Sequence, residues 1–223
     1  LRVMGQVSYY VWLTKQFTAP INVAIPSGNF GNAYSAWFGR THGLPINEIL
    51  CSTNVNDVLR RFINGGVLEP LVTEPSVAPS MDIQIPSSLE RLIFDLSRDA
   101  KSFYDQLQTN SKAQLDEKSV GGLQDVFSSV TFTDEMIKTL ITSLHDEFHV
   151  IFDPHSVTSV QMALENDSSL PTVAVATASP EKFGNVISPL IKNFTESKIE
   201  EKEQYLTLST ENPEIIGAIK DFI

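Results

Sequence analysis

Hydrophobic positions in the first third of the chain alternate between a helical and a strand-like spacing. Apolar residues close to the start recur on one helical face, and residues 21–25 form a short apolar run that is typical of a buried strand. The same alternation continues with elements predicted at 31–42 (helix), 48–52 (strand) and 56–63 (helix). Helices that alternate with buried strands predict an α/β fold, with a parallel sheet flanked by helices.

The middle of the chain has mainly helical spacing. Ser87 and Glu90 have the spacing of a capping box in front of an apolar helix face. Residues 109–124 are polar and include two adjacent glycines, so we predict a surface loop there. Thr133 is the predicted N-cap of a further helix.

Strand-like spacing returns in the last part of the chain, at residues 148–152 and 172–176. Each of these predicted strands is followed by a capping residue and a proline, Asp153-Pro154 in one case and Ser179-Pro180 in the other. Proline is favoured at the first helical position, so both pairs predict the start of a helix.

Composition and charge exclude several classes of protein. The 223 residues are 42% hydrophobic and 19% charged, which is the balance of an ordinary globular protein. Acidic residues outnumber basic ones by 27 to 16, for a formal net charge of −11, so we expect no nucleic acid partner. No apolar run approaches the ~18 residues of a membrane span, so we expect no membrane partner either. The single cysteine, Cys51, cannot form an internal disulfide, which favours an inert buried thiol and a reducing compartment such as the cytoplasm.

The most informative local segment runs from Pro26 to Asn32, between a predicted strand and a predicted helix. Gly28 and Gly31 allow successive backbone N–H groups to point at one spot, where the helix dipole adds partial positive charge. This arrangement is typical of an anion site, and phosphate is the usual anion. The segment lacks the lysine of a Walker A loop and the glycine spacing of a dinucleotide fingerprint. A plain strand-to-helix turn is the alternative, and the pattern alone leaves both open.

Three other candidates for chemistry are weaker. Thr177 follows the strand predicted at 172–176, at the sheet edge where ligands collect in α/β folds, although an ordinary loop residue is the simpler interpretation. Ser179 is most simply a helix cap. His145 and His149 share one helix face, but their order differs from the metalloprotease motif and no third ligand is evident, so we predict no metal site.

Five groups of segments, taken in order, resemble the threonine synthase family, whose members use pyridoxal 5'-phosphate (PLP). They are IPSGNFGN (25–32), GLPI with TNVNDVL (43–46 and 53–59), PSMDI with LER (79–83 and 89–91), DPHS (153–156) and ATASPEKF (176–183). The resemblance implies fold type II of the PLP enzymes, which is tryptophan synthase beta-like, here in incomplete form. It also implies that residues 1–194 are the later part of the PLP-binding catalytic region. From its own composition and spacing, we expect the stretch 195–223 to be a charged C-terminal segment with a short closing helix.

The resemblance further implies a carbon–oxygen lyase acting on phosphate, which converts O-phospho-L-homoserine and water to L-threonine and phosphate. The residues it assigns to the phosphate of PLP are Gly28, Asn29, Phe30, Gly31 and Asn32. It places Thr177 at the pyridine nitrogen, where a neutral hydroxyl leaves that nitrogen largely unprotonated. Ser179 departs from the pattern, because the family usually has His there.

The Schiff-base lysine lies upstream of these segments in the family, and no lysine of this chain has a matching context. The chain also begins at Leu1 within a helical pattern. We therefore expect a C-terminal fragment that is inactive alone and is completed by the missing N-terminal part of the same protein. Two alternatives stay open: a related PLP-dependent lyase acting on another phospho-amino acid, and a non-catalytic phosphate-binding module.

Overall fold

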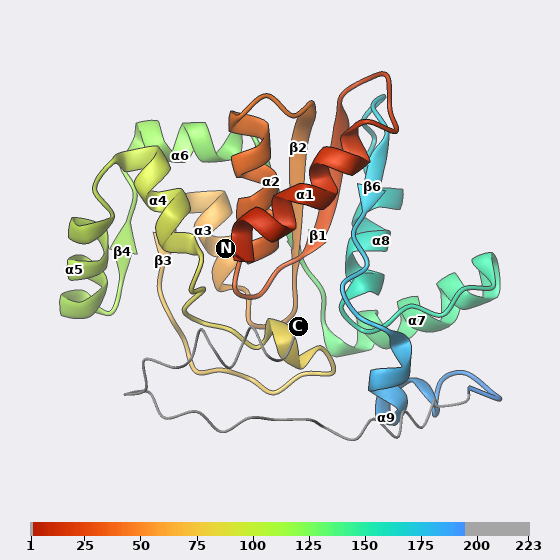
Figure 1. Ribbon diagram of the computed structural model, residues 1–223. Coiled ribbons are helices and arrows are strands. Elements are labelled where there is room, and N and C mark those ends of the chain that lie inside the picture. The colour runs from red at the N-terminus through yellow and green to blue at the C-terminus, as the bar shows by residue number, and fades with distance from the viewer. Residues whose placement is uncertain (1, 195–223) are drawn as a thin grey trace, which may run out of the picture.

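The computed structural model describes residues 2–194, which are built around a four-stranded sheet (Figure 1). The strand order is β5-β2-β1-β6, and every neighbouring pair is parallel. The bounds are β1 (Ile21–Pro26), β2 (Ile46–Thr53), β5 (Phe127–Thr131) and β6 (Thr172–Ala174). A separate antiparallel pair joins β3 (Val67–Leu68) to β4 (Ala113–Gln114). The predicted fold class, a parallel sheet flanked by helices, is confirmed.

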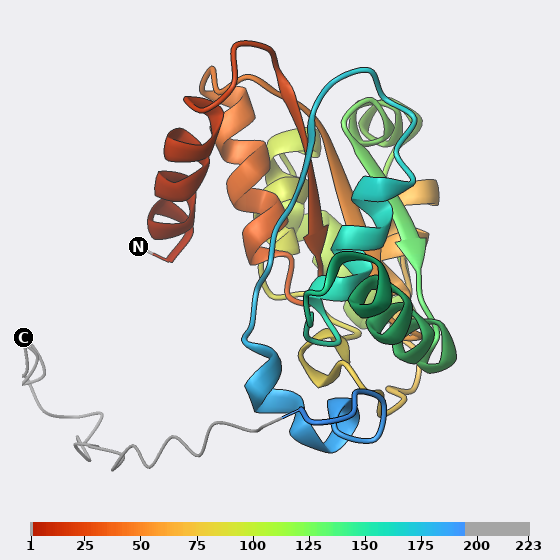
Figure 2. The same ribbon diagram turned by 90° about the vertical axis from the view of Figure 1, so that its right-hand side faces the viewer.

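Helices cover both faces of the sheet, as the side view shows (Figure 2). The hydrophobic core on one face includes residues of α1 (Arg2–Thr14), α2 (Gly31–Thr41), α3 (Val58–Gly65), α4 (Leu89–Ser97), α5 (Ala100–Asn110) and α6 (Glu117–Gln124). The core on the other face includes residues of α7 (Asp134–Phe148), α8 (Ser156–Leu164) and α9 (Gly184–Ile187). Along β1, Val23 and Ile25 enter the first core and Ala24 enters the second. This alternation explains why the strand is apolar at every position.

The carboxyl ends of the four parallel strands lie at the same edge of the sheet, the lower edge in Figure 1. A short 3₁₀ helix, η1 (Pro79–Met81), lies beneath that edge, and a second, η2 (Pro180–Phe183), follows β6. Pairing of β1 with β6 brings the segments that follow these strands together, since Val175 N–H donates to the Ala24 carbonyl oxygen at 2.8 Å.

Two predictions about the second half of the chain are wrong. Residues 148–152 are not a strand, because α7 continues to Phe148 and His149 then takes a left-handed conformation (φ 55°) that ends the helix. The loop predicted at 109–124 contains β4 and α6 instead. Asp116 caps α6 by accepting a hydrogen bond from Ser119 N–H at 2.9 Å, and this cap outweighs the two glycines within the helix.

Helix α8 begins at Ser156, two residues later than the Asp153-Pro154 pair suggests. Asp153 still acts as a cap, since its carboxylate accepts from the N–H groups of His155 and Ser156. The charged segment at 195–223 and its closing helix lie outside the described residues.

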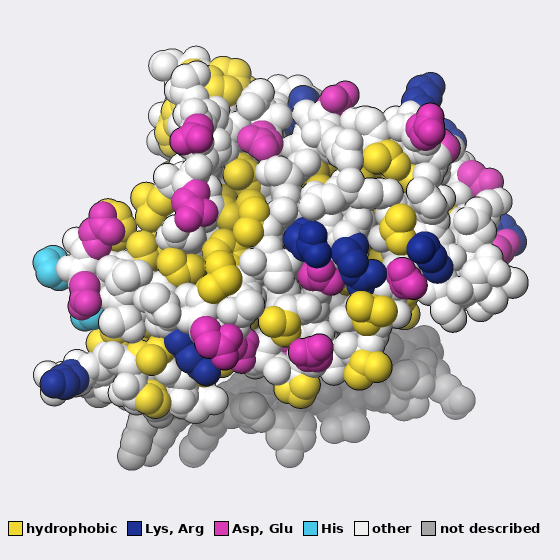
Figure 3. Space-filling model, turned by 180° about the vertical axis from the view of Figure 1, so that it is seen from behind, with side chains coloured by type: hydrophobic (Ala, Val, Ile, Leu, Met, Phe, Trp, Pro, Cys, Tyr) yellow, Lys and Arg dark blue, Asp and Glu magenta, His cyan; other side chains and the backbone are white. Residues whose placement is uncertain are grey.

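Surface charge is mixed, as the back view of the molecule shows (Figure 3). Lys and Arg side chains on this face lie among Asp and Glu side chains. Among the ion pairs of the described residues, Arg60 and Arg61 both pair with Asp57. Among residues 2–194, no helix combines the length and the apolar character needed to cross a bilayer.

Candidate functional site

A cavity of about 540 Å³ opens at the carboxyl edge of the sheet. Residues 26–33 form one wall, and α1 forms a second with Tyr9 and its neighbours. His155 and residues of η1 form a third wall, and residues 175–177 form the fourth. The volume falls within the ~300–1,000 Å³ that is typical of small-molecule sites. The structure therefore brings the two segments singled out in the sequence, Gly28–Asn32 and Thr177, to one cavity.

The segment between β1 and α2, residues 27–30, is called the glycine loop below. Its first N–H group, on Ser27, donates to the Ser52 carbonyl oxygen at 2.9 Å. The N–H groups of residues 28–33 donate to no group within the described part of the chain. Free N–H groups at the start of a helix carry partial positive charge, so this is the donor set that an anion requires.

Phe30 fixes the shape of the glycine loop. Its backbone is left-handed (φ 64°), which is uncommon for a large side chain. The ring is buried against Phe127, with the ring centroids 5.6 Å apart. Packing of this ring therefore holds the loop in a conformation that the backbone alone disfavours.

The two glycines have different roles. A Cβ on Gly28 would lie 2.4 Å from the Ser80 carbonyl oxygen, a backbone atom of η1, so only glycine fits. A Cβ on Gly31 would lie 3.4 Å from Ser88 Oγ, an ordinary contact. Neither glycine has a left-handed φ. Gly28 serves the close approach of η1, and the left-handed position is Phe30.

Two asparagines, Asn29 and Asn32, connect this wall to neighbouring segments by hydrogen bonds. The Asn29 carbonyl oxygen accepts from Ser88 N–H at 3.0 Å, and Asn29 Oδ1 accepts from Ser87 Oγ at 3.2 Å. The capping box predicted at Ser87 is therefore wrong: α4 begins at Leu89, its N-cap Ser88 forms no side-chain cap, and the Ser87 hydroxyl bonds Asn29 instead.

Asn32 Oδ1 accepts hydrogen bonds from the hydroxyl groups of Tyr9 and Tyr10, each at 2.5 Å. Burial raises the pKa of both tyrosines, so both hydroxyls are protonated donors at neutral pH. The two donors orient the Asn32 amide from α1.

The segment after β6 is more loosely held. Thr177 is exposed and lines the cavity, and its N–H donates to Ser156 Oγ at 2.9 Å. Its hydroxyl forms no hydrogen bond with a described residue. Ser179 is the exposed N-cap of η2, forms no side-chain cap and does not line the cavity.

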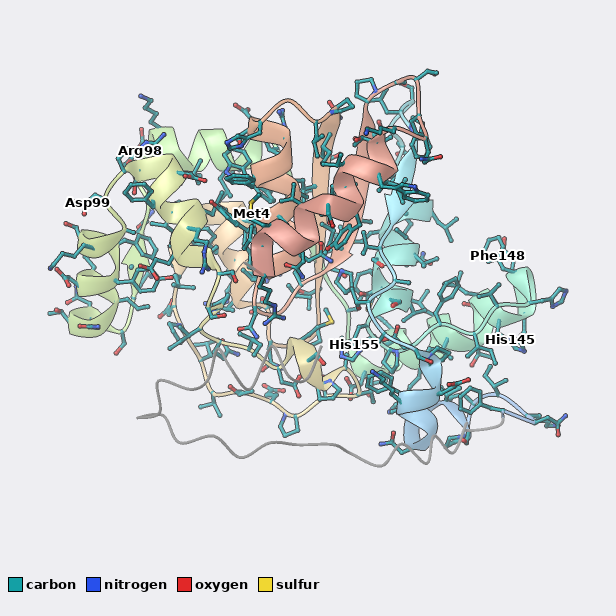
Figure 4. All side chains as sticks on the ribbon, in the orientation of Figure 1. Met4, Arg98, Asp99, His145, Phe148 and His155 are labelled. Carbon is teal, nitrogen blue, oxygen red and sulfur yellow. The ribbon has the colours of Figure 1, made fainter. Side chains whose placement is uncertain are left out.

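His155 is the main cavity residue to which the sequence assigned no role. Figure 4 shows it beneath the sheet, beside η1. Its Nδ1 lies 2.8 Å from Asp153 Oδ1, and its Nε2 accepts from Ser80 N–H at 3.1 Å. Burial alone would raise the pKa of the Asp153 carboxyl, but hydrogen bonds from His155 and Ser156 outweigh it and lower that pKa. The DPHS segment (153–156) was the part of the sequence that could have indicated a role for His155.

Comparison with known proteins decides the family. No family model matches the chain. The threonine synthase of Pseudomonas aeruginosa is 32% identical over 195 residues, which are 83% of this chain and 42% of that protein. The threonine synthase of Saccharomyces cerevisiae is 30% identical over 240 residues, covering 94% of this chain and 47% of that protein. The crystal structure of PLP-bound threonine synthase from Brucella melitensis superposes with a TM-score of 0.81 at 31% identity, over 84% of this chain and 42% of that one. The chain belongs to the threonine synthase family.

Membership of the threonine synthase family confirms the resemblance found in the sequence and the type II fold. The chain spans less than half the length of the curated relatives it matches.

Cys51, His145 and His149 do not line the cavity. Cys51 is fully buried, and burial raises the pKa of its thiol to about 12, so the thiol is inert at neutral pH. His145 and His149 belong to no group of three or more metal-ligating side chains within residues 2–194. No lysine is among the described residues that line the cavity.

Proposed function

We propose that this chain is part of a PLP-dependent threonine synthase, which converts O-phospho-L-homoserine and water to L-threonine and phosphate. Its family membership supports the reaction class. The observation that carries the cofactor assignment is the set of N–H groups on residues 28–33, which border the cavity and have no partner among the described residues. Such a set fits a phosphate group.

Two segments of the cavity lining would hold the two ends of PLP. Backbone N–H groups of Gly28, Asn29, Phe30, Gly31 and Asn32 would bind the phosphate. The Thr177 hydroxyl, which belongs to another wall of the cavity, would donate a hydrogen bond to the pyridine nitrogen and leave that nitrogen largely unprotonated. When bound, PLP supplies the electron withdrawal that elimination needs, and the protein supplies position and polarity.

The lysine that binds the cofactor would come from outside residues 1–223, in the N-terminal part of the same protein. The absence of lysine from the described cavity lining supports this. We expect residues 1–223 alone to form no threonine, even with PLP added. Threonine formation by these residues would contradict the proposal and direct attention to their own lysines.

The direct test uses the protein expressed from its whole coding sequence. PLP and pyridoxal, which lacks the phosphate, are titrated by absorbance, and threonine formation from O-phospho-L-homoserine is assayed. We expect PLP to bind much more tightly than pyridoxal and threonine to form. Equal affinity for the two compounds would contradict the phosphate assignment.

The same assay separates the alternatives. Turnover of another phospho-amino acid, but not of O-phospho-L-homoserine, would indicate a related lyase. PLP or phosphate binding without any turnover would indicate the non-catalytic module, which the lysine-free lining of the described cavity also fits. A cytoplasmic location completes the proposal and rests on the single buried thiol of Cys51; fractionation of cells tests it.

A further inference from the structure

Two adjacent residues of the DPHS segment connect to two different walls of the cavity. His155 Nε2 accepts from Ser80 N–H at 3.1 Å, and Ser156 Oγ accepts from Thr177 N–H at 2.9 Å. Both side chains are buried, with 3% and 1% of their surface exposed. The start of α8 therefore contacts η1 on one side and the segment after β6 on the other.

The hydrogen bonds of His155 fix its tautomer. Because Nε2 accepts from Ser80, Nδ1 must carry the proton, which it donates to Asp153 Oδ1 at 2.8 Å. The Asp153 carboxylate also accepts from His155 N–H at 2.9 Å and lies at the N-terminus of α8, where the helix dipole favours negative charge. Phe183 packs on the ring with centroids 4.9 Å apart. The imidazole is thus neutral and held in one orientation.

His155 influences the position of the glycine loop through η1. Its partner Ser80 also presents the carbonyl oxygen that would meet a Cβ on Gly28 at 2.4 Å. A shift of Ser80 would therefore change the support of the glycine loop and the direction of its free N–H groups. On the other side, Ser156 fixes the backbone of Thr177, whose hydroxyl faces no other described partner.

Asp153 adds an independent observation. Its second oxygen, Oδ2, is buried without a hydrogen-bond partner among the described residues. An unpaired buried carboxylate oxygen is costly, and an ordinary helix cap at the surface avoids that cost. The same carboxylate orients His155, which favours a role for that histidine.

We propose that His155 and Ser156 are positioning residues that set the two ends of the cofactor site separately: His155 the phosphate end, through Ser80 and Gly28, and Ser156 the ring end, through Thr177. This inference rests on the proposed PLP function. Neither residue needs to take part in bond making or breaking.

The first arm of the test compares His155→Asn with His155→Gln in the protein expressed from its whole coding sequence. Gln can place its carbonyl oxygen near the position of Nε2 and accept from Ser80, whereas Asn reaches only the position of Nδ1. We expect His155→Asn to bind PLP about tenfold more weakly and pyridoxal within about twofold of the wild type, with most PLP affinity restored in His155→Gln.

The second arm uses Ser156→Ala, with Thr53→Val as the matched control. Thr53 is a buried hydroxyl residue of β2 that bonds Thr131 and lies outside the cavity lining. We expect Ser156→Ala to keep the preference for PLP over pyridoxal but to shift the absorbance maximum of the bound cofactor. The control is expected to leave both unchanged.

The outcomes separate the two proposals. A wild-type protein without preference for PLP over pyridoxal would overturn the proposed function itself. A wild-type preference that His155→Asn leaves intact would overturn only the positioning role. Equal weakening of PLP and pyridoxal binding in both His155 variants, with a lower melting temperature, would assign His155 a purely structural role and overturn the inference as well.

Discussion

The turns that follow β1 and β6 meet at one cavity but are held very differently. The turn after β1 is supported by η1 at Gly28, by the start of α4 at Asn29 and by two tyrosines at Asn32. The turn after β6 follows a three-residue edge strand, and Thr177 has a single backbone hydrogen bond to Ser156. Several backbone N–H groups can bind one anion only if the surrounding structure holds all of them in the right direction. A single hydroxyl group needs only to lie within hydrogen-bond distance of its partner. The first turn is therefore the more sensitive to substitution.

Replacing Gly28 with Ala is expected to have the largest effect. The new methyl group would meet a backbone oxygen of η1 at 2.4 Å, so either the glycine loop or η1 must move. We expect a loss of about 1–3 kcal/mol in the free energy of unfolding and at least tenfold weaker PLP binding. Denaturant unfolding and PLP titration measure the two effects. Wild-type values for both would show that η1 does not support the loop.

Gly31→Ala is the matched control, because its Cβ has room against the protein. We expect little change in stability, and any loss of PLP affinity would then come from crowding of the anion. A stability loss as large as that of Gly28→Ala would remove the distinction between the two glycines.

Removing the charge of Asp153 tests the residue that lies between the two turns. The pKa of Asp153 is lowered from its ordinary value of 3.8, so its stabilising effect is fully present above about pH 3.8 and is lost as the pH falls through the lowered pKa. We expect Asp153→Asn to reduce stability by about 1–2 kcal/mol at neutral pH, with the difference from wild type shrinking below pH 3.8. Denaturant unfolding across this pH range measures it. A difference that grows in acid would contradict the assigned hydrogen bonds.

Tyr10→Phe removes one of the two hydroxyls that orient Asn32. Tyr10 is fully buried and Tyr9 is 36% exposed, so the loss of the Tyr10 hydroxyl is the more costly. We expect Tyr10→Phe to lower the free energy of unfolding by about 1 kcal/mol and Tyr9→Phe to lower it by less. PLP affinity should fall in the same order. Equal effects would mean that burial of the donor is unimportant here.

Thr177→Val is expected to have the smallest effect on folding, below about 0.5 kcal/mol, because the side chain is exposed. If the hydroxyl meets the pyridine nitrogen, the variant changes the absorbance of bound PLP and slows turnover, and Thr177→Ser restores both. An unchanged spectrum and unchanged kinetics would leave Thr177 an ordinary loop residue.

The sequence predicted what depends on neighbouring residues and missed what depends on distant ones. Continuous apolar runs identified β1 and β2, whereas β5 has the sequence FSSVT and escaped notice. Its polar side chains are satisfied across the sheet: Ser129 Oγ donates to the Cys51 carbonyl oxygen at 2.7 Å, and Thr131 Oγ1 lies 2.9 Å from Thr53 Oγ1. A hydropathy pattern does not register such pairing.

The candidate site divides in the same way. The free N–H groups of the glycine loop follow from local geometry, and the sequence predicted them. The contacts that hold the loop join residues far apart in the chain, such as Tyr10 with Asn32 and Ser80 with His155, which is 75 residues away. One-dimensional spacing contains no signal for these pairs. The wrong prediction of a capping box at Ser87 has the same origin, because the Ser87 hydroxyl donates to the distant Asn29 side chain instead.

The position of the cavity between the two hydrophobic cores has a consequence for cooperativity. Phe30 belongs to the core on one face of the sheet, while the helix that starts at Ser156 buries Val157 in the core on the other. A ligand that contacts both walls is therefore released when either core opens. By mass action, a ligand present at a hundred times its dissociation constant raises the free energy of any opening that releases it by about 2.7 kcal/mol. Hydrogen exchange of backbone amides on both faces of the sheet should then slow together when the cavity is filled.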